Sequence, residues 1–84
     1  MIRYTVLWRT EVQDDLTQLW LDSPDRQQIA AAADLIDAEL LIDAHVKGSM
    51  LRQGARLLIC PPLAARFRVD EGDRKVFVEA IDLL

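Results

Sequence analysis

The last third of the chain, residues 54–84, is the feature that most limits how this sequence can fold. Three short runs of alternating apolar and polar residues lie there, at residues 55–60, 63–69 and 75–81. Pro61-Pro62 separates the first two runs, and Asp70-Glu71-Gly72-Asp73 separates the last two. A period of two indicates strands with one buried face. Short clusters of Pro, Gly and Asp, such as the two separators, are typical of turns. The sequence therefore predicts three consecutive strands joined by short turns.

The N-terminal part predicts one more strand and the first of two helices. Residues 3–9 are rich in β-branched and aromatic residues, which favours a strand with Tyr4, Val6 and Trp8 on one face. Thr10 and Gln13 have the spacing of a capping box, in which the side chains satisfy early backbone amides of a helix. We expect this helix to end near residue 21.

A second helix follows almost at once. Ser23 suits the N-cap and Pro24 the first helical position, and we expect the helix to run to about residue 43. So short a link predicts an antiparallel helical hairpin. Residues 48–54 then read as a loop with at most a short extended piece. The order β-α-α-β-β-β predicts an α+β fold, in which the N-terminal helical hairpin packs on one face of a mostly antiparallel four-stranded sheet.

Length and composition predict one soluble domain spanning residues 1–84. Hydrophobic residues make up 51% of the chain, which allows a core without disulfides or a structural metal. The single cysteine, Cys60, has no partner within the chain, which suits a reducing compartment. The first residues lack the apolar run of a signal peptide, and no uncharged stretch approaches the roughly 20 residues that span a bilayer. We therefore expect a cytoplasmic protein with no membrane association.

The charge is unevenly distributed along the chain. The formal net charge of −4 argues against an obligate nucleic-acid binder, which needs clustered lysine and arginine. Residues 1–44 carry three basic and nine acidic side chains, a balance of −6, whereas residues 45–84 carry seven basic and five acidic ones, a balance of +2. Between Asp43 and Asp70 lie five basic residues and no acid. Local potential depends on this asymmetry more than on the net charge.

Most residues that could carry chemistry have a simpler structural interpretation. His45 and Cys60 occur once each, so no metal-ligand cluster exists, and we interpret both as structural rather than as a Cys–His nucleophile pair. Asp34, Asp37 and Asp43 read as a solvated helix face rather than an acid/base pair. The two tryptophans could stack nucleic-acid bases, but their spacing favours a core or interface role. No metal or cofactor is predicted.

The acid-free basic segment is the remaining candidate for a functional site. Arg56 lies on the second predicted strand, and Arg66 and Arg68 share one face of the third. Lys47 and Arg52 precede them in the loop. Such a set could bind RNA phosphates, or it could bind acidic segments of a protein partner. A polar outer sheet face that is simply basic is the structural alternative.

Several short patterns resemble the RelE/ParE superfamily of bacterial toxins. They are a Tyr-x-Val-x-Trp strand, a helical hairpin, and then Gly54-Ala55-Arg56-Leu57, Phe67-Arg68-Val69 and Val76-Phe77-Val78. As an order of elements, the resemblance covers nearly the whole chain. It implies a cognate antitoxin as partner and, as target, either translation on the ribosome or DNA gyrase.

For members that resemble RelE, the family pattern implies a metal-independent mRNA endoribonuclease. By position, Arg56 matches a basic residue of the second strand, and Arg68 (or Arg66, in another register) matches the arginine of the third strand. These cations would stabilise the developing charge on the scissile phosphate. The sequence departs from the pattern because Leu58 replaces a basic partner and because no Arg, Tyr or His follows Ile81. We therefore expect nuclease activity to be weak or lost.

Three interpretations remain open at this stage. The first is a toxin or toxin homologue that is bound by an antitoxin. The second is a non-catalytic domain on the same fold, used for protein–protein contact or for forming a homodimer. The third is an unrelated small α+β domain.

Overall fold

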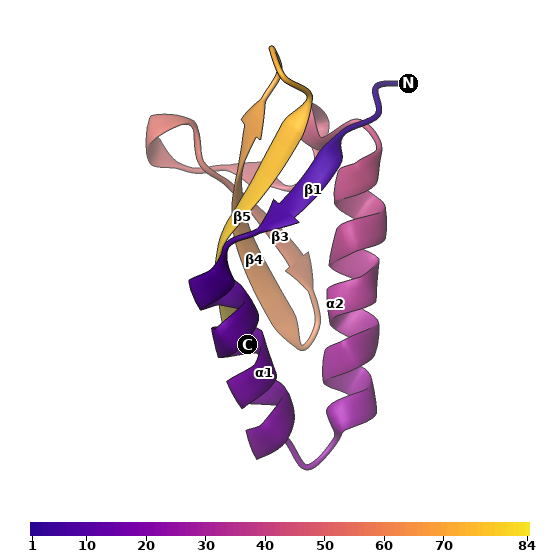
Figure 1. Cartoon of the computed structure of the whole chain (residues 1–84), viewed down its shortest axis with the longest axis vertical. Helices are drawn as coiled ribbons and strands as arrows, with labels where there is room; N and C mark the ends of the chain where they lie inside the picture. Colours follow the sequence, from indigo (N-terminus) through magenta and orange to yellow (C-terminus); the bar gives the residue numbers. More distant parts are fainter.

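The computed structural model describes the whole chain, residues 1–84. Its elements are β1 (Thr5–Trp8), α1 (Thr10–Asp22), α2 (Arg26–Leu41), β2 (Ser49–Met50), β3 (Arg56–Cys60), β4 (Leu63–Asp70) and β5 (Lys75–Leu83). Two short 3₁₀ turns, η1 (Ala44–Val46) and η2 (Arg52–Gly54), flank β2. The strands form one sheet in the order β1-β5-β4-β3-β2, and the two helices cover one side of it (Figure 1). Neither helix has the length and apolar character needed to cross a membrane.

The predicted α+β class is confirmed, with two differences in the sheet. The sheet has five strands rather than four, because Ser49–Met50 pairs antiparallel with β3. It is also mixed, because β1 runs parallel to β5 while the other pairs are antiparallel. A two-residue strand is too short to show an alternating pattern, so the sequence marked this segment only as a loop.

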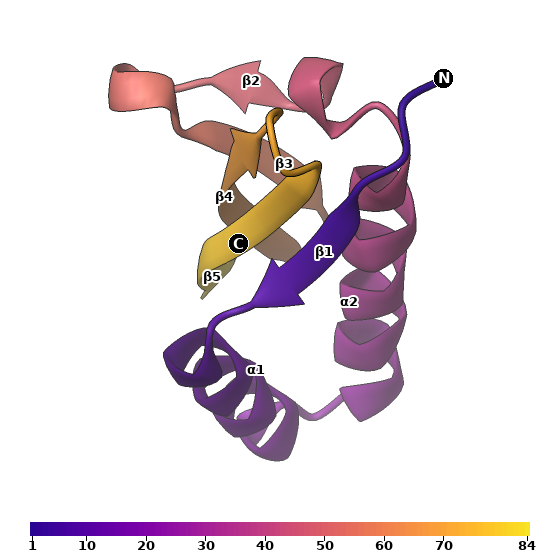
Figure 2. The ribbon, with the colours of Figure 1, turned by 45° about the horizontal axis from the view of Figure 1, so that its top comes forward.

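A glycine permits this added strand. Gly48 has a φ of 66°, and a Cβ built on it would lie 2.1 Å from the backbone oxygen of Leu57. The backbone at residue 48 therefore passes so close to β3 that only glycine can occupy the position. Figure 2 shows β2 beside β3, at the end of the sheet where η1 also lies.

Both predicted helix starts need correction. No side chain caps α1, and the Gln13 amide instead donates to the carbonyl oxygen of Trp8 at 3.0 Å. The second helix begins at Arg26 rather than at Pro24, because Asp25 is its N-cap and accepts the amide of Gln28 at 3.2 Å. Its end at Leu41 also falls short of residue 43. Several polar side chains within three residues of each helix start could act as the N-cap, and the local sequence does not indicate which of them does.

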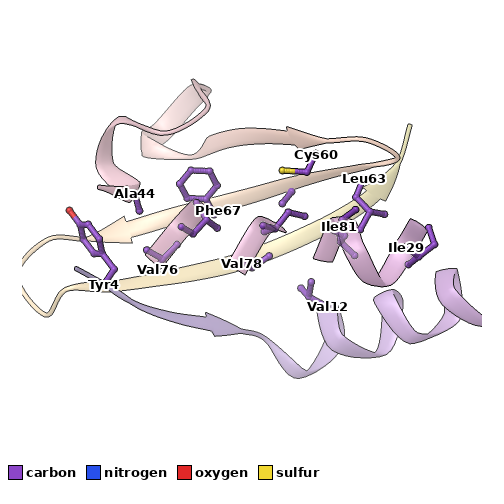
Figure 3. Close-up of a cluster of buried hydrophobic side chains, with 14 residues drawn as sticks. Tyr4, Val12, Ile29, Ala44, Cys60, Leu63, Phe67, Val76, Val78 and Ile81 are labelled. Carbon is purple, nitrogen blue, oxygen red and sulfur yellow. The ribbon is translucent and has the colours of Figure 1, made fainter. Parts of the chain in front are cut away.

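The core lies between the helical hairpin and the covered face of the sheet (Figure 3). It contains 14 buried residues, which come from α1, α2, η1, β3, β4 and β5 together with Tyr4 just before β1. The strand β1 adds Val6 and Trp8, which are partly buried against this cluster. Each fully buried large side chain contributes about 1.5–3 kcal/mol of transfer free energy. The largest of them are Phe67, Ile29, Ile36, Leu40, Leu63, Val76 and Val78.

A β-bulge in the β4–β5 pairing places Ile81 on the same sheet face as Val78, whereas strict alternation along residues 75–81 would place them on opposite faces. Arg66 pairs with Ala80 and Phe67 with Val78, so Glu79 has no partner of its own across the ladder. The extra residue shifts the alternation. Ile81 is therefore buried with Val78.

Candidate functional site

An open groove lies at the end of the sheet where β4 ends and β3 and β5 begin. Its volume is about 540 Å³. Strands β3 and β4, the turn after β4, β5 and the two 3₁₀ turns contribute its walls. The lining residues are His45, Gly54, Arg56, Arg68, Val69, Asp70, Glu71 and Phe77. Two of the three arginines predicted as catalytic therefore meet in one groove, together with the only histidine.

The strand register explains how the arginines reach this groove. Arg56 pairs with Phe67, whose side chain is in the core, so alternation places Arg56 on the helix-covered face. Arg68 pairs with Phe77 and lies on the opposite face. Both positions are at the same end of the sheet. The groove therefore receives one cation from each face of the sheet: Arg56 from the helix-covered face and Arg68 from the opposite face.

Arg56 holds the loop before β3 in place. Its Nε donates to the carbonyl oxygen of Lys47 at 2.7 Å, and its Nη2 donates to that of Gly48 at 3.4 Å. These bonds satisfy two carbonyl groups next to the short strand β2. Nη1 is the one terminal nitrogen of this guanidinium without a hydrogen bond in the structure.

Arg68 is partly neutralised by Glu79. Its Nε lies 2.8 Å from Oε1 of Glu79, whose Oε2 accepts a hydrogen bond from Nη2 of Arg9 at 2.8 Å. The Glu79 side chain is only 14% exposed, so water screens this network less than it screens a surface pair. Nη1 of Arg68 also donates to the carbonyl oxygen of Gln53. Only Nη2 of Arg68 remains without a partner.

His45 contacts the buried Tyr4 through one of its ring nitrogens. The Tyr4 hydroxyl lies 3.0 Å from Nδ1 of His45, and Tyr4 itself is only 2% exposed. The two residues are 41 positions apart in sequence. Tyr4 precedes β1 and His45 is in η1, and an antiparallel bridge between Arg3 and Ile42 brings the two segments together. In this bridge the backbone amide of Tyr4 donates to the carbonyl oxygen of Leu41 at 2.8 Å.

The other predicted site residues lie outside this groove. Arg66 is exposed on the same face as Arg68 and makes no ion pair. Arg52 is exposed in η2. Lys47 forms an ion pair with Glu39 at 3.0 Å, so its charge is partly neutralised. The structure therefore does not bring all five cations into one patch.

The groove carries charge of both signs. Asp70 and Glu71 line it from the turn after β4. Asp70 is held there, because its Oδ1 accepts the backbone amide of Asp73 at 3.1 Å. With Arg68 partly neutralised by Glu79, the groove has a much weaker positive potential than the sequence suggested. At the side of the groove formed by His45 and Arg56, N–H groups can still donate hydrogen bonds to an anionic group.

A second, larger groove of about 890 Å³ follows the outer edge of β1. It lies between residues 3–6 and the helix α2, from which Asp34, Asp37 and Leu41 line it. Because β1 is the terminal strand, its backbone is paired on one side only. Asp37 is exposed on α2, and one of its carboxylate oxygens accepts a hydrogen bond from Nε1–H of Trp8 at 2.6 Å.

Cys60 is separate from both grooves. It is buried in the core, and burial, with a smaller contribution from the charge of Glu39, raises the pKa of its thiol. A thiol with a raised pKa is a poor nucleophile near neutral pH. No group of three or more His, Cys, Asp or Glu side chains is arranged to hold a metal ion.

Sequence reasoning missed three residues of this site. The sequence interpretation of His45 is structural, Tyr4 is too distant in sequence to be linked to it, and nothing in the predicted strand at residues 75–81 singles out Glu79. The position of His45, two residues before Lys47 in the acid-free segment, was the one local signal that could have drawn attention to it.

Comparison with known proteins identifies the fold. No protein-family profile and no curated protein sequence matches the chain. Among solved structures, a chain of the toxin–antitoxin complex RelBE2 from Mycobacterium tuberculosis superposes with a TM-score of 0.80 and 23% identity, covering 100% of this chain and 94% of that chain. A chain of the chromosomal ParDE toxin–antitoxin system from P. aeruginosa gives a TM-score of 0.70 and 17% identity, covering 98% and 97%. The chain therefore has the fold of the RelE/ParE toxin superfamily, as its sequence pattern predicted.

Proposed function

We propose that this chain is the toxin component of a toxin–antitoxin pair and that a cognate antitoxin binds it. The fold similarity spans almost the full length of chains from two different toxin–antitoxin complexes. Fold alone does not define an activity. The proposal therefore also depends on the grooves described above, one suited to a polypeptide segment and one to an anionic group.

The groove along β1 suits an antitoxin segment in extended conformation. An unpaired strand edge offers backbone hydrogen bonds to an added strand. Charged side chains of both signs line the groove, including Arg3, Arg74, Asp34 and Asp73, and can select the side chains of that segment. We infer that the antitoxin covers this edge.

The target we propose is mRNA on the ribosome, cleaved without a metal and at a low rate. Arg56 and Arg68 lie in one groove and retain one terminal nitrogen each for a scissile phosphate. Preorganised cations stabilise charge that develops in a transition state. The low rate follows from the pairing of Arg68 with Glu79 and from the carboxylates of Asp70 and Glu71 in the same groove.

Growth on induction tests this function most directly. The chain is induced in bacteria with and without the small protein encoded next to it, and mRNA is examined by primer extension. We expect slowed growth, rescue by the neighbouring protein, and cleavage sites that are lost with Arg56→Ala. Arg26→Ala, which removes a cation that stacks on Trp20 far from the groove, is the matched control. Normal growth and intact mRNA would refute the proposal.

A second candidate is binding to a protein target such as DNA gyrase, without nuclease chemistry. The uncovered face of the sheet supports it, because Leu7 (38% exposed) and Ile59 (54% exposed) lie there with Arg66. Exposed apolar residues beside arginine are typical of protein interfaces. A supercoiling assay distinguishes the two candidates, since this function predicts inhibition that Ile59→Asp abolishes and Arg56→Ala leaves unchanged.

A further inference from the structure

The contact between Tyr4 and His45 determines which ring nitrogen of the histidine carries the proton. The only hydrogen bond of the Tyr4 hydroxyl is with Nδ1 of His45, at 3.0 Å. Tyr4 is only 2% exposed, and its O–H has no other hydrogen-bond partner in the structure. A buried hydroxyl that fails to donate costs about 1–3 kcal/mol. The hydroxyl therefore donates to Nδ1, which must be unprotonated, and a neutral imidazole then carries its proton on Nε2.

This tautomer gives the groove an N–H donor that its arginines do not supply. His45 is half-buried and lines the groove together with Arg56 and Arg68. With Nδ1 engaged by Tyr4, Nε2 is the ring atom left to meet a ligand. We propose that Nε2–H of His45 binds a phosphate group of single-stranded RNA in this groove, and that Tyr4 positions it. The inference rests on the proposed function, because it names a further residue of the same site.

The free donors favour a phosphate over a carboxylate. Arg56 has donated Nε and Nη2 to the loop carbonyls, and Arg68 has committed Nε and Nη1. In each guanidinium one terminal nitrogen has no partner and Nε is already engaged, so the fork formed by Nε and a terminal nitrogen is closed to a planar carboxylate. Single donors from three different elements match the tetrahedrally arranged oxygens of a phosphate. His45 is the one neutral donor among them.

The acidic residues limit where the phosphate can bind. Asp70 and Glu71 come from the turn between β4 and β5, and their charge repels an anion at that end of the groove. His45 and Arg56 come from η1 and from the start of β3. The phosphate therefore binds at the side of His45 and Arg56. For this reason the contribution of His45 is large relative to that of Arg68, which Glu79 already engages.

Nitrogen NMR of the imidazole tests the proposal directly. In the free protein we expect one unprotonated nitrogen at Nδ1 and one protonated nitrogen at Nε2. Titration with a short single-stranded RNA oligonucleotide should shift the Nε2–H resonance, and inorganic phosphate should shift it in the same direction at higher concentration. Because the chain has one histidine, the signal needs no assignment by mutation. An imidazole spectrum that RNA leaves unchanged at saturation overturns the proposal.

Binding measurements on variants supply the second readout. His45→Ala should weaken RNA binding about tenfold, the loss expected for one hydrogen bond to a charged group. His45→Gln, whose amide nitrogen can take the place of Nε2–H, should recover part of the affinity, whereas His45→Asn should not. Tyr4→Phe should leave the groove cations in place but weaken binding several-fold, with loss of the single tautomer. Equal losses in His45→Gln, His45→Asn and His45→Ala would show a merely structural role and overturn the proposal.

The two proposals fail in different ways. If induction leaves growth normal but RNA shifts the Nε2–H signal, only the proposed toxin function is wrong. If induction slows growth and mRNA is cleaved while His45→Ala binds RNA as the wild type does, only the role of His45 is wrong. Should Tyr4→Phe fail to fold, the His45 variants and the imidazole spectrum of the wild type still decide the question.

Discussion

Nε of Arg68 lies 2.8 Å from Oε1 of Glu79, so the arginine that the family resemblance marks as catalytic is paired with a carboxylate of the same chain. The second oxygen of Glu79 binds Arg9, which ties the strand β4 to the start of α1 through one side chain. The bulge in β5 makes this possible, because it leaves Glu79 without a cross-strand partner. Arg68 is thereby converted from a free cation into part of a structural network.

Removing the charge of Glu79 should release Arg68. Glu79→Gln is expected to raise affinity for single-stranded RNA roughly fivefold and to steepen its salt dependence, because one or two more cations can contact phosphates. Binding titrations at several salt concentrations measure both effects. Glu39→Gln is the matched control, since it removes a carboxylate that pairs with Lys47 outside the groove. If the double variant Glu79→Gln with Arg68→Ala keeps the gain, the release of Arg68 is not its cause.

Gly48 should tolerate no side chain. Gly48→Ala places a Cβ at 2.1 Å from the Leu57 carbonyl oxygen at a φ of 66°. We expect a loss of about 2–4 kcal/mol in the free energy of unfolding, from steric strain and from unpairing of β2. Urea titration measures it. Gly72→Ala is the control, because its φ is not positive and its Cβ would lie 3.4 Å from the Asp70 carboxylate, so a loss of the same size there would contradict the steric explanation.

Phe67 should be the most sensitive core position. It is fully buried at the centre of β4, so Phe67→Ala should lower the free energy of unfolding by about 3–5 kcal/mol through lost transfer free energy and the cavity left behind. A marginally stable domain would then be largely unfolded. Circular dichroism during thermal unfolding checks this. Ile59→Ala, at a position 54% exposed on the adjacent strand, should change stability by less than about 1 kcal/mol.

The buried thiol of Cys60 should make stability fall in alkaline solution. Burial raises its pKa above the ordinary value of 9.0, so the folded protein disfavours the thiolate. A group whose pKa is raised on folding stabilises the native state fully below the unfolded pKa and loses that contribution as pH rises through the folded pKa. Unfolding free energies measured from pH 7 upward should therefore decline more in the wild type than in Cys60→Ala. Parallel profiles for the two proteins would refute the assignment.

The same residue offers a kinetic check on burial. A thiol-specific reagent should modify Cys60 slowly in the native protein and rapidly in urea, since reaction requires the thiolate to be exposed. The rate in the native state then reports the local or global opening that exposes the core. Fast native modification would mean that the β3–β4 hairpin opens readily.

The sequence alone determined the class of fold, the order of the elements apart from β2, and the face of most strands. Alternation at residues 3–9, 55–60 and 63–69 identified the strands, and helical spacing identified the hairpin, because both patterns depend on neighbours a few residues apart. It also placed Arg56 and Arg68 on consecutive strands. In the structure these strands are paired, and Arg56 lies opposite Phe67, the residue next to Arg68.

Tertiary structure decided what these residues can do. The bulge at Glu79 moved Ile81 into the core and gave Arg68 its carboxylate partner, and no local pattern specifies a bulge of this kind. The backbone bridge between Arg3 and Ile42 brought Tyr4 to His45 across 41 positions. Charge pairing, tautomer and groove composition depend on contacts between residues distant in the chain. The sequence therefore determined the fold, and only the folded chain determined which of its basic groups remain free to bind.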